Sequence, residues 1–161
     1  MNEMIEKIVS GGQTGADQAA LDVAIQAGIP HGGWVPRGRM TEAGALSDRY
    51  RMREMPTDGY AERTERNVID SDGTIIFSHG ALDGGSALTE IRAEEHGRPH
   101  LHLDMERLSI AGAAGTLKEW IKNNAIRVLN VAGPRASKDP DIYRVTTAVL
   151  ESLLGKNRAA I

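Results

Sequence analysis

The sequence of 161 residues contains no cysteine, and this absence excludes several chemistries at once. Disulfide bonds, thiolate metal ligands, iron–sulfur clusters and a cysteine nucleophile all need that side chain. Aromatic residues are also scarce, at 4%, and no apolar run is long enough for a secretory signal or a bilayer span. We therefore expect a cytoplasmic protein that does not interact with a membrane.

A basic excess is missing too. The chain has 19 Lys and Arg against 22 Asp and Glu, so its formal net charge is −3. Proteins that bind nucleic acid usually carry a basic face or stripe, whereas the basic residues here are scattered. We expect no nucleic-acid partner. The length suits one domain, residues 1–161, with its own hydrophobic core.

Segments typical of strands and of helices alternate along the chain. This alternation predicts an α/β fold: a single-domain, Rossmann-like, open doubly wound sheet of about five mainly parallel strands, with helices on both faces. We expect residues 36–56 to form a long functional loop and residues 156–161 to be frayed. Strands are predicted at 5–10, 31–35, 73–78, 100–104 and 126–132, and helices at 16–27, 60–70, 86–96, 116–124 and 140–154.

The segment from Ser10 to Gly28 places a glycine-rich turn between the first strand and the first helix. Glycine allows positive φ and close approach to a ligand, and a helix N-terminus favours an anion. A tight strand-to-helix turn needs the same glycines, but Gln13 and Thr14 also offer side-chain hydrogen bonds, which favours binding. Asp17 would hold the loop or a ligand hydroxyl. The candidate binding residues are Gly11, Gly12, Gln13, Thr14, Gly15 and Asp17.

A second glycine turn follows the strand at 73–78 and precedes hydroxyl-bearing residues at the start of a helix. Ser86 would either bind phosphate or simply cap its helix. Because ligands of doubly wound sheets lie at the carboxyl ends of the strands, the two turns predict two halves of one phosphate site. The candidates of this second half are Gly84, Gly85, Ser86 and Thr89.

Four other positions carry side chains that suit binding or catalysis. Arg135, after the last strand, can pair bidentately with phosphate or serve only as a loop residue. Asn67 either positions a ligand, which we favour, or helps to cap and turn the chain. Trp34 either packs or stacks on a flat ring at the mouth of the site. Glu90 is the candidate acid or base, with a surface role near a helix start as the alternative.

His100 and His102 lie two apart on a predicted strand and so share a face. That spacing permits metal binding, but no third ligand of fixed spacing is evident. We expect no metal site, and histidines that are packed or hydrogen-bonded.

The chain contains the motifs IVSGGQTGADQAALDVAIQAGIPHGGWVPRGR, YAERTERNVIDSDGTIIFS, DGGSALTE, HLHLD and LNVAGPRASKDPDIY. Together these motifs resemble the molybdenum carrier-like (molybdenum cofactor carrier-like) family, which is related to the lysine decarboxylase-like (LOG-type) Rossmann proteins. The resemblance implies a self-associating α/β protein that binds molybdenum cofactor by its phosphate end at the two glycine turns, with molybdoenzymes as possible recipients.

Two functions fit these observations. The first is a protein that binds or carries a phosphate-bearing ligand, either molybdenum cofactor or a nucleotide. The second is a phosphoribohydrolase-like enzyme that cleaves a nucleotide, with Glu90 or Asp17 as acid or base and Arg135 or Arg37 steadying charge. The related hydrolases carry PGGxGTxxE where this chain has DGGSALTE, and this departure weakens the second function.

Overall fold

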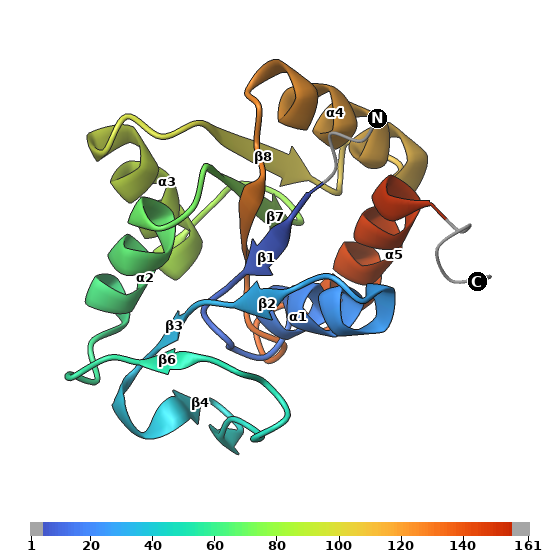
Figure 1. Cartoon of the computed structure of the whole chain (residues 1–161). Coiled ribbons are helices and arrows are strands. Elements are labelled where there is room, and N and C mark those ends of the chain that lie inside the picture. The colour runs from blue at the N-terminus through green and yellow to red at the C-terminus, as the bar shows by residue number, and fades with distance from the viewer. Residues whose placement is uncertain (1–4, 156–161) are drawn as a thin grey trace.

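Five parallel strands form the central sheet of the structure, a computed structural model that describes residues 5–155 (Figure 1). This confirms the predicted α/β class with a mainly parallel sheet. The segment 156–161, expected to be frayed, lies outside the described residues. In spatial order the strands are β2 (His31–Gly32), β1 (Lys7–Val9), β9 (Val128–Ala132), β7 (Gly73–Ser78) and β8 (His100–Asp104).

The helices cover both faces of this sheet (Figure 1). On one face α5 packs between α1 and α4, and on the other α2 packs against α3. The bounds are α1 (Ala16–Ala27), α4 (Ile110–Asn123) and α5 (Ile142–Leu154) on the first face, and α2 (Tyr60–Ile69) and α3 (Gly84–Glu95) on the second.

The two faces differ in character because side chains alternate along each strand. Ile75 and Phe77 of β7 belong to the large apolar core under α1, α4 and α5. Thr74, which directly precedes Ile75 and so lies on the other face of the strand, points to the α2 and α3 side and accepts a 3.1 Å hydrogen bond from the Asn130 amide of β9. The apolar face stabilises the fold, and the polar face leaves room for a site.

The segment predicted as one strand at 31–35 is two strands in different sheets. Gly33 separates β2 from β3 (Trp34–Val35) with a φ of +125°, and a Cβ there would lie 2.2 Å from the Ser10 carbonyl oxygen. β3 instead pairs with β6 (Arg53–Glu54). The prediction of one strand was wrong because periodicity does not reveal this close backbone crossing.

Residues 36–56 are more ordered than a loop. They contain the short helix η1 (Arg37–Arg39) and a hairpin of β4 (Met40–Thr41) and β5 (Gly44–Ala45). Leu46 and Tyr50 of this excursion pack with Leu21 of α1 in a second small core. That packing fixes the excursion beside the first glycine turn.

Some predicted bounds also shift. α4 begins at Ile110 rather than 116, because Ser109 caps it by accepting a hydrogen bond from the Gly112 N–H. α3 begins at Gly84, two residues before the predicted start. The glycine turn after β7 is therefore part of the helix itself.

The strand order matches a known doubly wound order if the strands are renumbered so that β7 is the first. With β7, β8, β9, β1 and β2 numbered one to five, the sheet reads 2-1-3-4-5. The order reverses between β7 and β9, so a ligand crevice is expected at their carboxyl ends.

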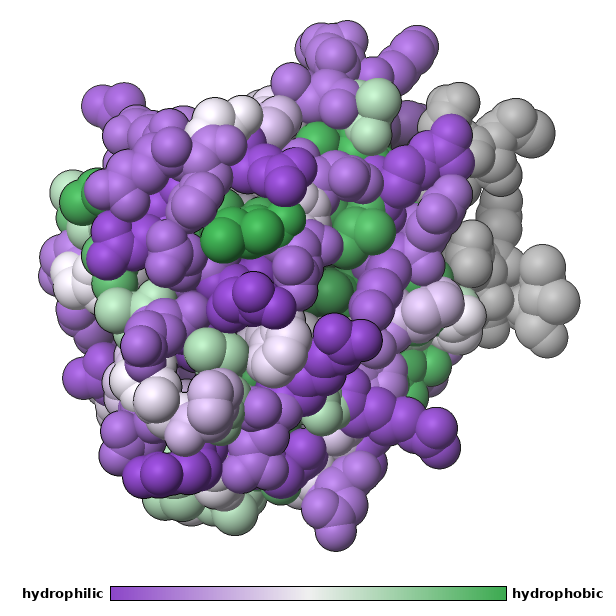
Figure 2. Space-filling view, turned by 60° about the vertical axis from the view of Figure 1, so that its left-hand side comes forward, coloured by the Kyte–Doolittle hydropathy of each residue, from purple (hydrophilic) through white to green (hydrophobic). Residues whose placement is uncertain are grey.

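Figure 2 shows a face made mainly of hydrophilic side chains, with small hydrophobic patches between them. No helix within residues 5–155 has the length and apolar character needed to cross a membrane. Exposed large hydrophobic side chains are spread over separate elements, at Ile25, Met40, Tyr60, Ile91 and Tyr143. They mark no single interface, and self-association stays a prediction.

Candidate functional site

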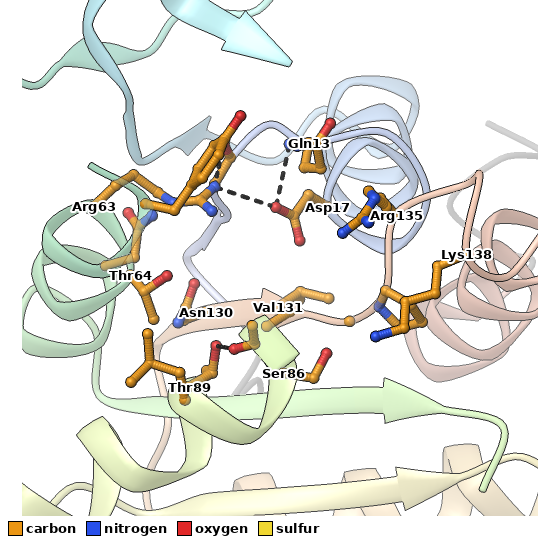
Figure 3. Close-up of a pocket in the computed structure, with 18 of the residues that line it drawn as sticks. Gln13, Asp17, Arg63, Thr64, Ser86, Thr89, Asn130, Val131, Arg135 and Lys138 are labelled. Carbon is orange, nitrogen blue, oxygen red and sulfur yellow. Dashed lines mark hydrogen bonds and ion pairs between the residues drawn. The ribbon is translucent and has the colours of Figure 1, made fainter. Parts of the chain in front are cut away.

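A pocket of about 300 Å³ opens at the carboxyl ends of β1, β9 and β7, where the topology predicts a crevice (Figure 3). Arg63 lies on one side of it and Arg135 and Lys138 on the other, with Asp17 above and Ser86 below. The lining comprises Gly11, Gln13, Asp17, Tyr60, Arg63, Thr64, Asn67, Asp83, Gly85, Ser86, Leu88, Thr89, Asn130, Val131, Ala132, Gly133, Pro134, Arg135 and Lys138.

The first turn of α3 forms one wall of the pocket. A Cβ on Gly85 would meet no heavy atom within 4 Å, so the backbone is open there. The first N–H groups of a helix have no partner inside it, and within residues 5–155 those of Gly85 and Ser86 bond to no other group either. Thr89 donates its hydroxyl to the Gly85 carbonyl at 2.9 Å. This end of α3 is suited to an anion.

Arg63 of α2 forms the opposite wall, and only 11% of its side chain is exposed. Its guanidinium donates to the Gly11 carbonyl at 2.8 Å, lies 3.6 Å from an Asp17 carboxylate oxygen and stacks over the Tyr60 ring. Its buried Nε has no hydrogen-bond partner among the described residues. That N–H is a donor without an acceptor beside the cavity.

Asp17 occupies the first glycine turn with its own carboxylate. The Gln13 N–H donates to it at 3.2 Å, and the Gly11 backbone also bonds to it. Burial raises the pKa of Asp17 to about 6, against the opposing charge of Arg63. Asp17 therefore holds the turn in place. Holding this loop is one of the two roles predicted for it, the other being to bind a ligand hydroxyl.

The glycines of this turn serve close packing. Gly12 has a φ of +75° and would place a Cβ 2.9 Å from Val35, and Gly15 has a φ of +86° and would place one 2.4 Å from the Pro134 carbonyl oxygen. At Gly11 a Cβ would overlap the Arg63 guanidinium. Only Gly11, Gln13 and Asp17 of this turn line the pocket.

At the rim, exposed carboxylates pair with two cations. Lys138 lies 2.7 Å from Asp83, and Arg135 lies 3.3 Å from Glu42 of the excursion. Glu42 also accepts hydrogen bonds from the Thr14 hydroxyl and from the Ser137 N–H and hydroxyl. Thr14 therefore binds Glu42 and does not line the pocket.

Three more predicted residues have other partners. Asn67 lines the pocket, but its amide bonds to the N–H and carbonyl of Trp34. The Trp34 ring lies beside Arg53 and Arg66, outside the pocket lining. Glu90 is outside the lining as well and faces His100. This placement does not favour the hydrolase.

His102 accepts or donates a 2.6 Å hydrogen bond with Ser78. Gly84 and Arg37 lie outside the pocket lining, and among the predicted candidates of the second turn Gly85, Ser86 and Thr89 belong to it.

Sequence reasoning missed Arg63, Lys138 and Asn130. Arg63 lies in a run of charged residues that reads as a solvated helix face, and only its contact with Gly11, far away in sequence, reveals its role. Lys138 lies three residues after Arg135 in the loop that follows β9, and this closeness in sequence was the available signal. Tyr60, not Trp34, is the aromatic side chain in the lining.

A family model described as "Circularly permutated YpsA SLOG family" matches residues 8–154. The chain belongs to this family. The 2-1-3-4-5 order recovered by counting from β7 is what a circular permutation of a doubly wound sheet produces.

A crystal structure from Syntrophus aciditrophicus SB, of a protein named "Putative molybdenum carrier protein", is also similar. It is 57% identical, with a TM-score of 0.93, and the match covers 94% of this chain and 96% of that one. The chain matches no curated protein. The resemblance to molybdenum carrier-like, LOG-type proteins is thereby confirmed.

Proposed function

We propose that this member of the family is a carrier that binds a phosphate-bearing small molecule, molybdenum cofactor or a nucleotide, in the pocket. One observation carries the proposal: Gly85 and Ser86, whose N–H groups have no partner among residues 5–155, line the same cavity as Arg63, Arg135 and Lys138. A phosphate there accepts N–H bonds from α3 and lies in the field of three cations. The name of the 57% identical relative, "Putative molybdenum carrier protein", supports a molybdenum-containing cargo.

The charges at the rim support reversible binding. Arg135 is 53% exposed and Lys138 is 41% exposed, and exposed ion pairs stabilise a protein by only about 0–1 kcal/mol. A ligand phosphate therefore takes over the pairing with Arg135 and Lys138 at little cost in ion-pair energy, while Glu42 keeps its hydrogen bonds to Thr14 and Ser137. Release restores those pairs, which suits a carrier.

The chain offers no thiolate to molybdenum, since it has no cysteine. Recognition of the cofactor then rests on its pterin and its phosphate. As part of the same proposal, the carrier acts in the cytoplasm as a homo-oligomer and passes its cargo to molybdoenzymes.

Calorimetry with molybdenum cofactor, AMP and ADP-ribose tests this proposal. We expect the wild type to bind the cofactor and Arg63→Met to bind it about 10- to 100-fold more weakly, because a hydrogen bond to a charged group contributes about 1.5–3 kcal/mol. Arg127→Met is the matched control, since Arg127 pairs with Glu6 at 2.8 Å and does not line the pocket.

Binding of AMP or ADP-ribose without the cofactor would overturn molybdenum cofactor as the cargo and leave a nucleotide-binding protein. Binding of none of the three, or equal binding by wild type and Arg63→Met, would overturn the proposal.

A further inference from the structure

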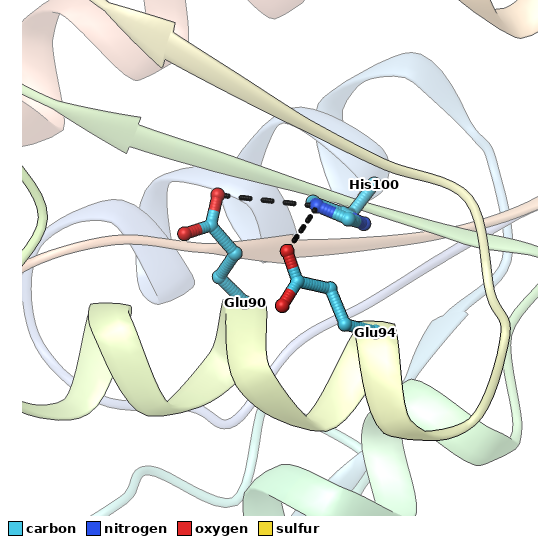
Figure 4. Close-up of side chains that lie close together, drawn as sticks. All are labelled: Glu90, Glu94 and His100. Carbon is cyan, nitrogen blue, oxygen red and sulfur yellow. Dashed lines mark ion pairs between the residues drawn. The ribbon is translucent and has the colours of Figure 1, made fainter.

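Three side chains that can ligate metals gather outside the pocket (Figure 4). Glu90 and Glu94 lie one turn apart on α3, and His100 begins the edge strand β8. One potential ligand atom of each lies within 4.8 Å of the others. The sequence showed no third metal ligand to accompany His100 and His102. The fold, however, brings two carboxylates, Glu90 and Glu94, next to His100.

The three groups do not satisfy one another. The Nε2 of His100 is 3.9 Å from a Glu90 oxygen and 3.6 Å from a Glu94 oxygen, both longer than an ordinary N–H···O hydrogen bond. Within residues 5–155, neither carboxylate accepts a hydrogen bond from any other group. Their oxygens converge on a shared space that none of them fills.

The cluster also lacks a compensating cation. Like charges four residues apart on a helix repel each other. The neighbouring arginines are engaged elsewhere: Arg92 pairs with Glu95 at 2.9 Å, and Arg98 donates to the Ile69 carbonyl at 2.9 Å. Among the described residues, His100 is the one basic partner of either glutamate.

We propose that Glu90, Glu94 and His100 bind a divalent transition-metal ion of the zinc type. Imidazole and carboxylate ligands lie about 2.0–2.2 Å from Zn²⁺, which places tetrahedral ligand atoms about 3.4 Å apart. The observed separations of 3.6 and 3.9 Å need only a small inward shift of these side chains, of which Glu94 is exposed and the other two are partly exposed. Three protein ligands leave one position for water or an external group.

Titration calorimetry of the full chain with Zn²⁺, after treatment with a chelator and dialysis at pH 7.5, tests the site. We expect one Zn²⁺ per chain and at least about 100-fold weaker binding in His100→Ala and Glu94→Gln, because loss of an outer-shell partner alone costs 10- to 100-fold.

His96→Ala is the matched control, because His96 pairs with Glu65 outside the cluster and its loss leaves Zn²⁺ binding unchanged. Glu94 is 61% exposed, so Glu94→Gln keeps the fold even if His100→Ala does not. No Zn²⁺ binding by the wild type, or equal binding by wild type and Glu94→Gln, would overturn the site. Neither result bears on the pocket, because none of the three residues lines it.

Discussion

At the scale of single residues, Asp17 and Arg63 set the electrostatics of the pocket wall. Asp17 is buried, and desolvation raises its pKa to about 6 although Arg63 lies 3.6 Å away. The carboxylate nevertheless holds the turn through Gln13. A buried carboxylate with a raised pKa lowers the stability of the folded protein, and such groups are common at functional sites.

The raised pKa of Asp17 predicts a pH dependence of folding. Between pH 4 and pH 7 the folded state binds more protons at Asp17 than the unfolded state, whose pKa is near 3.8, so stability falls as the pH rises through the folded pKa of about 6. Relative to Asp17→Asn, the wild type should lose up to about 3 kcal/mol of unfolding free energy over this range. Urea unfolding of both proteins at several pH values measures it. A stability difference that is constant with pH would contradict the prediction.

At the scale of elements, the amino end of α3 is the part of the pocket that an acidic substitution tests best. Gly85→Asp should strengthen the helix by about 0.3–1 kcal/mol through its dipole, while its carboxylate takes the place of the ligand phosphate. We expect thermal stability to rise and ligand binding to be lost. Ala111→Asp, in the first turn of α4, is the control that gains the dipole term and keeps binding.

Retained ligand affinity in Gly85→Asp would show that the phosphate lies elsewhere, provided that the melting temperature confirms a folded protein.

The excursion at 36–56 contributes Glu42, which competes with a ligand for Arg135. Glu42→Gln removes this competing charge and should tighten ligand binding about two- to fivefold, as the strength of an exposed ion pair implies. Calorimetry measures it, with Glu119→Gln on α4 as the control. Weaker binding in Glu42→Gln would mean that Glu42 holds the ligand rather than competing with it.

Much of this element pattern was predictable, because β-branched runs and amphipathic spacing are local signals. β7 was placed at its observed bounds, 73–78, as the six consecutive buried residues of a strand covered on both faces. The split at Gly33 was not predictable, since it depends on contact with Ser10 across the fold. The same limit applies to the first glycine turn. Its glycines were predicted to bind a ligand, but Gly12 and Gly15 are needed because distant segments of the chain pack closely against them.

At the scale of the whole molecule, the permuted strand order explains why three distant segments meet. The pocket needs the ends of β1, β9 and β7, which are neighbours in the sheet but far apart along the chain. Alternating strands and helices predict a parallel sheet, yet they do not specify where β9 inserts. Arg63 and Lys138 escaped prediction because their roles depend on that insertion.

The central claim is that this pocket holds a phosphate-bearing ligand. Native mass spectrometry of the purified protein, with and without added molybdenum cofactor, AMP or ADP-ribose, tests it most directly. We predict one phosphate-bearing adduct per chain in the wild type and in Arg127→Met, and its loss in Arg63→Met and Gly85→Asp. Absence of any such adduct from the wild type, or an adduct that persists in both pocket variants, would contradict the claim.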